Sequence, residues 1–432
     1  MHFKRAVTFI FILTAMTIVQ ASAWAQTEAE VVSENVVLRW NRVLKETVAT
    51  PGQHPGTVMP VRSYAMMHAA MFDAANSIDG KYAAYLVDVP ASRHASPEAA
   101  TAQAAHDVLL ALYPARAGVL AAELSASLNG IDPIGRFLGV RIGKTAAARM
   151  IKARENDGWL VTPPAYSLPP SPGNWQPTPP ANSAVTFTHY GNVKPFAIDS
   201  AEHFAPATPP VMTSSRYTAS FNEVKALGAV NSAVRTADQT QVARLWANVG
   251  TPTNFLHVWN NVATTVSEAK ELDTVSCARL FALINISLHD ALQTTFASKF
   301  EHGLWRPVHA IQRADEDGNP DTEADPSWQS LIAAPPYPTY AGNMAAIGTS
   351  QATVLALFFG RDDIAYEHTW DGAGGATRWY PGFNAMADEQ ERARVYGGIH
   401  FTFDQEAGQS VGRNVGNYVF QNLMTPRVRG RR

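Results

Sequence analysis

Three stretches in the last third of the chain combine basic residues with glycine and proline in a pattern that suits anion binding. The first runs from Lys299 through Gly303 to Arg306 and Pro307. Gly303 can turn the backbone and Pro307 suits the first position of a helix, so Lys299 and Arg306 are expected on either side of a tight bend. A lysine point charge and the planar fork of an arginine together suit an oxyanion. Taken alone, such a pair is more often two separate surface charges.

The second stretch runs from Arg394 through Gly397 and Gly398 to His400 and Asp404. One helix is expected to end near Arg394 and the next to begin near Asp404, which places His400 just before a helix N-terminus, where anions bind well. Asp404 lies four residues on and could orient the imidazole, which would make His400 a better nucleophile or ligand. The alternative is that Asp404 only caps the helix while His400 packs in the core.

The third stretch is rich in proline and runs from Pro335 to Met344. It leads into a helix of small and apolar residues, so the backbone N–H groups near Gly342 and Asn343 are expected to be free to bind an anion. An ordinary helix entry is the alternative interpretation.

The elements that position these stretches are predicted to be helices. Apolar residues recur at helical spacing in most of the chain, and few segments alternate with period two, so an all-α fold without a substantial sheet is expected. The predicted helices cover residues 62–77, 97–112, 134–154, 217–227, 237–248, 273–299, 307–315, 342–360, 385–395 and 404–423.

The middle of the chain differs from this pattern. Eight prolines lie between residues 163 and 180, and proline blocks helix. The segment also carries aromatic residues such as Trp175, Tyr190 and Phe196, so a loop packed over the helices is predicted, with a linker between domains as the alternative. The predicted organisation is a signal peptide at 1–25, an N-terminal helical part at 26–160, the Pro-rich loop at 161–214 and a C-terminal helical part at 215–432.

Composition excludes several classes of protein. Hydrophobic residues make up 46% and charged residues 16% of the 432 residues, which allows a large core. The formal net charge of −3 gives no basic field for nucleic acid. Cys277 is the single cysteine, so no intramolecular disulfide can form, and a buried inert thiol is expected.

The N-terminus has the pattern of an export signal. Lys4 and Arg5 precede an apolar run, and small residues from Ala21 to Ala25 suit a signal peptidase. A secreted or periplasmic protein without stable membrane insertion is therefore expected, with a retained anchor as the alternative. No later stretch is expected to span a membrane, and a homodimer stays open as an assembly.

Together the three stretches resemble the vanadium-dependent haloperoxidases, which share their fold and anion site with the type 2 phosphatidic acid phosphatases and the bacterial class A acid phosphatases. The shared pattern is Lys-x6-Arg-Pro, a Pro-rich turn into a helix, and Arg-x5-His-x3-Asp. Further similarities are Trp305-Arg-Pro, Asp317-Gly-Asn-Pro and Tyr396-Gly-Gly-Ile-His-Phe. The resemblance covers nearly the whole mature chain and implies a helical bundle of that family.

The resemblance also implies roles for individual residues. Lys299, Arg306 and Arg394 match the cations that surround the anion, and His400 matches the histidine that ligates vanadium or attacks phosphorus. It implies vanadate as cofactor, with phosphate as a competing anion. Hydrogen peroxide, a halide and a small-molecule substrate are the partners that it implies.

The chain departs from the family at its second motif, which normally reads Tyr-Pro-Ser-Gly-His. Without gaps, the serine falls on Gly342, the glycine on Asn343 and the acid/base histidine on Met344. A shift by one residue would place Asn343 on the histidine, so the histidine is missing in either register. The side chain of Asn343 could replace the lost hydroxyl. Loss of an acid/base group costs roughly 10²–10⁴ in rate, and Met344 would be open to oxidation by hypohalous acid.

Three hypotheses follow from the sequence. The first is a haloperoxidase-type enzyme with an altered proton relay, and the second is a phosphomonoesterase that uses His400 as nucleophile. The third is an oxyanion-binding protein without catalysis or with non-redox chemistry such as rearrangement. The sequence favours the first through its family resemblance.

Overall fold

The computed structural model describes residues 34–53, 58–247, 256–370 and 374–427. The predicted signal peptide at residues 1–25 and the end of the arginine-rich tail lie outside the described residues. From Val36 onward the chain forms a single compact unit.

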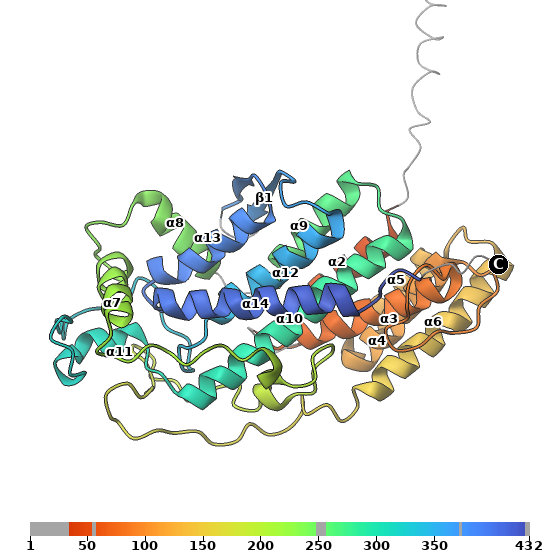
Figure 1. Ribbon diagram of the computed structural model, residues 1–432. Helices are drawn as coiled ribbons and strands as arrows, with labels where there is room; N and C mark the ends of the chain where they lie inside the picture. The colour runs from red at the N-terminus through yellow and green to blue at the C-terminus, as the bar shows by residue number, and fades with distance from the viewer. Residues whose placement is uncertain (1–33, 54–57, 248–255, 371–373, 428–432) are drawn as a thin grey trace, which may run out of the picture. The chain divides into compact units, whose positions relative to one another are not determined.

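Helices dominate this unit, as predicted (Figure 1). The α-helices are α2 Val36–Ala49, α3 Val61–Asp79, α4 Pro97–Leu112, α5 Ala117–Leu128, α6 Pro133–Ala153, α7 Ser215–Gly228, α8 Ala237–Ala247, α9 Leu256–Ala269, α10 Thr274–His302, α11 Pro307–Gln312, α12 Asn343–Phe359, α13 Phe383–Tyr396 and α14 Thr402–Asn422. Short 3₁₀ turns lie at Pro114–Arg116, Tyr190–Asn192, Ala201–Phe204 and Ala314–Glu316. The all-α prediction is confirmed.

Three helices were not expected from the sequence. In α2 four valines among the 14 residues weaken the helical signal, because β-branched residues favour strands. In α5 only Leu120 is buried, so the helix has no apolar stripe to reveal it. The third is α9, which no predicted helix covers.

A small hairpin is the only sheet among the described residues. Strand β1 Tyr366–Trp370 pairs antiparallel with β2 Ala376–Tyr380, with Tyr366 opposite Tyr380 and Trp370 opposite Ala376. Its side chains alternate between buried and exposed along β1. Because the hairpin is this short, the prediction that no substantial sheet forms holds.

Helix α10 is the central element, and α3, α12 and α14 pack against it. Asp273 caps its start by accepting a hydrogen bond from the N–H of Ser276 at 2.7 Å, and Gly303 ends it with a left-handed φ of 59°. By length and composition α10 could cross a membrane, which the sequence analysis had not expected of any later stretch. Its apolar window is 94% buried inside the molecule, however, so it is packed as a core helix.

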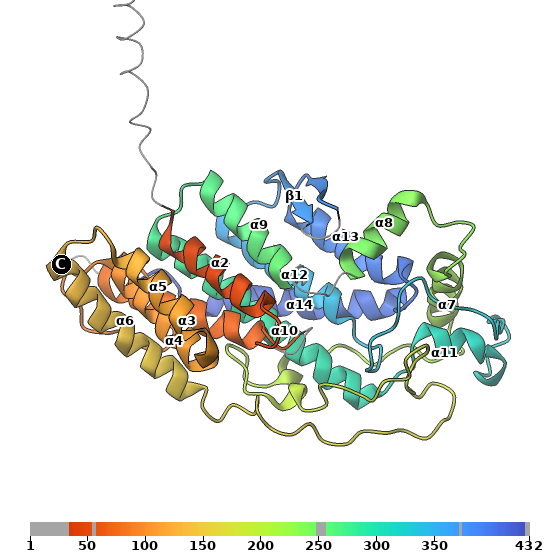
Figure 2. The ribbon, with the colours of Figure 1, turned by 180° about the vertical axis from the view of Figure 1, so that it is seen from behind.

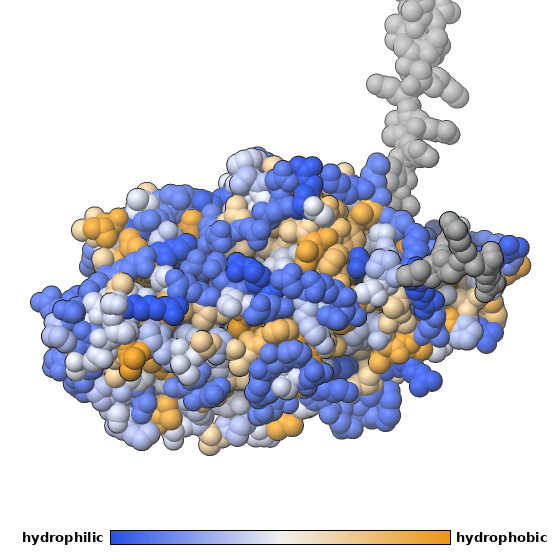
Figure 3. Space-filling model, in the orientation of Figure 1, coloured by the Kyte–Doolittle hydropathy of each residue, from blue (hydrophilic) through white to orange (hydrophobic). Residues whose placement is uncertain are grey.

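Two groups of helices flank α10. One group contains α3, α4 and α6, and the other contains α12, α13 and α14, which lie side by side (Figures 1 and 2). Cys277 lies buried in α10, as expected, and burial raises the pKa of its thiol to about 12. On the face in Figure 3, apolar residues are scattered between hydrophilic ones.

A row of glycines brings α14 against α12. Gly408, Gly412 and Gly416 are spaced four residues apart, so they share one face of α14. A Cβ added at these positions would lie 2.0, 2.4 and 2.7 Å from the carbonyl oxygens of Gly342, Ala346 and Ser350. Only glycine permits this approach, and it holds the start of α12 against the start of α14.

Two buried aspartates anchor long loops to the helices. Asp290 of α10 accepts hydrogen bonds from the backbone N–H groups of Phe196, Ala197 and Ile198. Asp73 of α3 holds the N–H groups of residues 85–87 in the same way. The Pro-rich segment that reaches residue 198 carries three buried rings: Trp175, Tyr190 and Phe196.

Candidate anion-binding site

The first predicted stretch forms a bend between α10 and α11. Lys299 lies in the last turn of α10 and Arg306 caps α11, with Gly303 between them. A Cβ on Gly303 would meet Leu168 Cδ1 at 2.4 Å, which together with its positive φ requires glycine here. Both cations are fully buried. The structure therefore turns Lys299 and Arg306 inward, and they are not separate surface charges.

The two cations make different contacts. The Lys299 ammonium donates to the carbonyl oxygens of Thr339 and Ala341, at 2.7 and 2.6 Å. The Arg306 guanidinium donates through Nε to the Tyr337 carbonyl and through Nη1 to the Ile399 carbonyl, each at 2.9 Å. Nη2 of Arg306 is buried and has no hydrogen-bond partner. Lys299 thus also fixes the approach to α12, whereas Arg306 keeps a donor group free.

His400 lies between Arg306 and Asp404. Its Nε2 is 3.0 Å from Arg306 Nη1, and its Nδ1 is 3.1 Å from Asp404 Oδ2 and 3.0 Å from the hydroxyl of Thr339. Arginine can only donate, so Nε2 must accept and the imidazole proton must lie on Nδ1. The Thr339 hydroxyl donates to Asp404 Oδ2 at 2.5 Å and therefore accepts from His400. This arrangement leaves the Nε2 lone pair directed at the cations.

Asp404 has both of the roles that the sequence left as alternatives. It is the third residue of α14, and its Oδ2 accepts from the Phe401 N–H at 3.0 Å, which caps the helix. The same oxygen orients His400. The imidazole is 1% exposed, but it is held by polar partners and is not simply packed among apolar residues.

Arg394 comes from the end of α13, as predicted. Its Nη1 donates to the Trp246 carbonyl at 3.0 Å, and its Nε is buried without a partner. Burial lowers the pKa of Arg394 to about 10. The electrostatic effects of Arg394 on Lys299 and Arg306 indicate that the first two stretches lie close together. The hydrogen bond from Lys299 to the Ala341 carbonyl joins the third stretch to them.

The site carries surplus positive charge. Burial lowers the pKa of Lys299 well below 10.5, and Arg306 and Arg394 lower it further, while Asp404 opposes them. Burial lowers the pKa of Arg306 to about 10. Burial, together with the three cations, also lowers the pKa of His400 well below 6.5, so the imidazole is neutral at pH 7.

Asp404 is the carboxylate that acts on Lys299 and Arg306 in the described part of the chain. Burial raises the pKa of Asp404 to about 6, against its hydrogen bonds and the nearby cations. Burying three cations with only one carboxylate beside them raises the free energy of the folded state unless a further anion binds.

The third stretch forms the start of α12. Gly342 is the N-cap and Asn343 the first residue of the helix, and both Asn343 and Met344 are 3% exposed. The Gly342 N–H donates to the Asp404 carbonyl at 2.8 Å, which joins α12 to α14, so the expectation that this N–H is free to bind an anion is wrong. Burial raises the pKa of Tyr337, and the nearby Asn343 side chain opposes this shift. Met344 packs into the large apolar core, so at this position the chain offers no titratable group.

Sequence reasoning missed three residues around this site: Thr339, Tyr337 and Gln405. The Tyr337 ring lies 5.5 Å from Lys299 Nζ and 5.2 Å from the Arg306 guanidinium carbon, so its face stabilises both cations. Thr339 and Tyr337 lie inside the Pro-rich stretch that the sequence singled out. Gln405 directly follows Asp404, but nothing in its spacing distinguished it from a solvent-facing residue of α14.

Three other histidines of the described chain are not hydrogen-bonded to His400. His68 is buried in α3 and its Nδ1 lies 2.9 Å from the Tyr64 carbonyl oxygen. The His302 ring packs edge-on against Tyr340 with centroids 5.4 Å apart. His309 is partly buried and its Nδ1 has no hydrogen-bond partner, and none of the three is bonded to His400.

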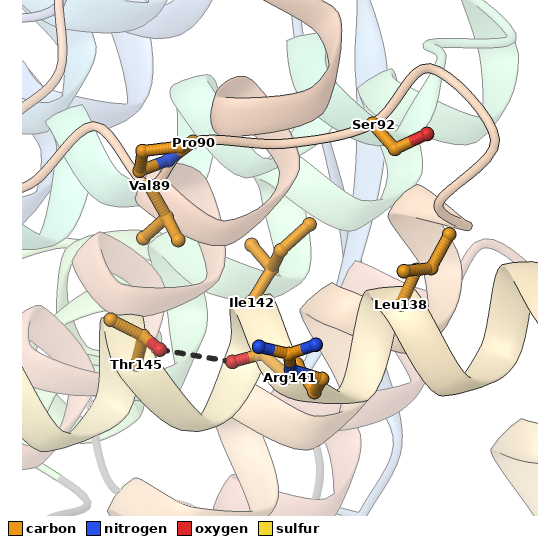
Figure 4. A pocket seen from close by; sticks show the side chains of 7 residues that line it. All are labelled: Val89, Pro90, Ser92, Leu138, Arg141, Ile142 and Thr145. Atoms are coloured by element: carbon orange, nitrogen blue, oxygen red, sulfur yellow. Dashed lines mark hydrogen bonds between the residues drawn. The ribbon is translucent and has the colours of Figure 1, made fainter.

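A surface cavity of about 170 Å³ lies between α6 and the loop at residues 89–92 (Figure 4). Figure 4 shows Leu138, Arg141 and Ile142 on the wall that α6 provides, where the Thr145 hydroxyl donates to the Arg141 carbonyl at 3.0 Å. Arg141 is the single charged residue of this lining. The cavity lacks the convergence of cations and imidazole that marks the site around His400.

Comparisons with known proteins relate the chain to vanadium haloperoxidases. A family model described as the VCPO second helical-bundle domain matches residues 279–427, which contain every cation of the site. The vanadium chloroperoxidase of Curvularia inaequalis is 26% identical over 412 residues, covering 77% of this chain and 67% of that enzyme.

Solved structures show the same fold. The first bacterial vanadium-dependent iodoperoxidase superimposes with a TM-score of 0.77 at 21% identity, over 91% of this chain and 97% of that one. The holo form of a bacterial vanadium-dependent chloroperoxidase gives a TM-score of 0.70 at 15% identity, over 89% and 96%. At these identities the structures establish the shared fold.

Proposed function

Since the chain belongs to the vanadium-dependent haloperoxidase-like family, we propose that it binds a tetrahedral oxyanion, vanadate or phosphate, among Lys299, Arg306, Arg394 and His400. The observation that carries the proposal is the buried surplus of positive charge with unpartnered donors on Arg306 and Arg394. A trivalent or divalent anion would neutralise this charge and accept those hydrogen bonds.

The residues around His400 set what the site can do. Because Asp404 and Thr339 hold the Nδ1 proton, the Nε2 lone pair is available as a ligand once an anion displaces Arg306 Nη1 from it. Vanadate, when bound there, supplies Lewis-acid chemistry for the oxidation of a halide by hydrogen peroxide. The cations and the N–H groups at the start of α12 hold the oxyanion, while Met344 offers no proton.

A second candidate function is phosphate-ester hydrolysis, which the unprotonated Nε2 of His400 also supports once the anion displaces Arg306 Nη1 from it. Nε2 would form a bond to phosphorus while the bond from phosphorus to the leaving oxygen breaks, and water would then release phosphate from His400. Without an acid at residue 344 the leaving group departs as an anion. Aryl esters are therefore expected to react and alkyl esters to be poor substrates.

The experiment that tests oxyanion binding is calorimetric titration with orthovanadate and with phosphate. Wild type is expected to bind one anion, and Arg306→Met to lose most of the affinity. Arg361→Met is the matched control, because Arg361 is exposed and paired with Asp363 at the surface. If wild type binds neither anion, or if both arginine variants behave alike, the proposal is wrong.

Assays on the vanadate-loaded protein then separate the functions. Peroxide-dependent oxidation of iodide or bromide that disappears in His400→Ala supports the haloperoxidase. Hydrolysis of aryl phosphates, inhibited by vanadate, supports the phosphatase. Anion binding without turnover in either assay assigns the chain an oxyanion-binding role alone.

A further inference from the structure

Gly342 leaves a gap in the anion site that another side chain occupies. Gly342 is the N-cap of α12, and an N-cap side chain normally projects over the free N–H groups at the helix start. A Cβ built on Gly342 would lie 2.4 Å from Gln405 Nε2 and 2.8 Å from Gln405 Cδ. The amide of Gln405, which comes from α14, therefore takes the place of a side chain at residue 342.

This amide is buried without partners. Gln405 is fully buried, and neither its Nε2 nor its Oε1 has a hydrogen-bond partner. An unpaired buried amide costs free energy, so a partner is expected in the working protein. Gln405 also follows Asp404, whose carboxylate orients His400 and whose carbonyl binds the Gly342 N–H.

We propose that Gln405 is an anion-binding residue whose Nε2–H groups donate to the bound oxyanion from the position that a side chain at residue 342 would otherwise fill. The inference rests on the proposed oxyanion site. It differs from the expectation that Asn343 fills this role, because both polar atoms of the Gln405 side chain are buried without a partner, whereas no polar atom of the Asn343 side chain is. An amide can donate but cannot transfer protons, so Gln405 restores binding and not acid/base catalysis.

The test uses phosphate and orthovanadate titrations by calorimetry on single variants. Gln405→Met keeps the length of the side chain and removes the donor, and it is expected to weaken binding about tenfold or more, as for loss of a hydrogen bond to a charged group. Gln409→Met is the matched control, because Gln409 lies one turn further along α14 with its amide exposed and bonded to Asp388. It is expected to bind like wild type.

A side-chain exchange gives a sharper result. Gly342→Ser alone would clash with the Gln405 amide, and Gln405→Ala alone would lose the donor, so each is expected to bind weakly. The double variant Gly342→Ser/Gln405→Ala removes the two shortest contacts of the added Cβ and leaves the Asp404 carbonyl oxygen at 3.0 Å, so it is expected to bind more tightly than either single variant. Thermal melting of each variant separates lost binding from lost folding.

The outcomes distinguish this inference from the proposed function. If wild type binds neither anion, the oxyanion site itself is refuted. If wild type binds and folded Gln405→Met binds equally well, the site stands and the role of Gln405 is refuted. Recovery in the double variant would support the exchange of one donor for another, and a double variant no better than its parents would contradict it.

Discussion

The glycine row of α14 makes a quantitative prediction about Gly408. An added Cβ would lie 2.0 Å from the Gly342 carbonyl oxygen and 3.1 Å from Ala345 Cβ, whereas ordinary contacts begin near 3.4 Å. Gly408→Ala must therefore move the start of α14 away from α12 by more than about 1 Å. Overpacking of this kind costs about 1–3 kcal/mol or more. The free energy of unfolding from urea titration measures it.

The control is Gly118→Ala in α5. Gly118 is exposed and an added Cβ would have no neighbour within 4 Å, so alanine is expected to stabilise the helix by about 0.5–1 kcal/mol. The same change at Gly416, where the added Cβ would lie 2.7 Å from a carbonyl, is expected to cost less than at Gly408.

Only Gly408→Ala is expected to weaken phosphate binding as well, because Gly408 packs against the N-cap of α12. The reasoning fails if Gly408→Ala is as stable as Gly118→Ala. It also fails if Gly408→Ala unfolds more easily but binds phosphate like wild type, because the contact would then not position the site.

Three further predictions concern buried polar groups. Burial raises the pKa of Glu391 to about 7, so its stabilising contribution is present below about pH 4.5 and is lost as the pH rises through 7. Glu391→Gln should therefore exceed wild type in unfolding free energy by up to about 3 kcal/mol at pH 8 but not at pH 4, and equal pH profiles would contradict this. Thr339→Val removes the hydrogen bond that lowers the pKa of Asp404, so the pH at which phosphate affinity changes should move to a higher value. Thr339→Ser keeps the hydroxyl and should behave like wild type. Asp290→Ala frees three backbone amides and should speed hydrogen exchange at residues 196–198, whereas unchanged protection would show that other contacts hold the loop.

The sequence predicted most of the helices because their ends carry strong signals. Ser96 and Pro97 mark the start of α4, and Gly303 marks the end of α10. It also identified the cations, since Lys299, Arg306 and Arg394 lie beside glycine or proline at helix ends. Such positions can be predicted because glycine and proline mark helix ends in the sequence itself.

The polar contacts around the site follow from tertiary packing and could not be predicted. Thr339 binds Asp404 across 65 positions in the chain, and no local pattern predicts that pairing. Gln405 becomes notable only because Gly342, 63 positions earlier, leaves space for its amide, and Gly408 brings the two helices together. Sequence reasoning noticed the missing serine at 342 but could not find its replacement on another helix.

At residues 342–344 the family motif would supply a serine, which donates a hydrogen bond, and a histidine, which donates a proton. This chain has Gly342, Asn343 and Met344 instead, so the two properties are separated. Hydrogen-bond donors for an oxyanion remain, in the N–H groups at the start of α12 and in the unpaired amide of Gln405. At residue 344 no proton donor remains, because methionine carries no acidic proton. Under the proposed function, chemistry at this site relies on charge and on the His400 lone pair. The proposed function therefore predicts a preference for substrates whose leaving group or oxidant needs no acid at residue 344.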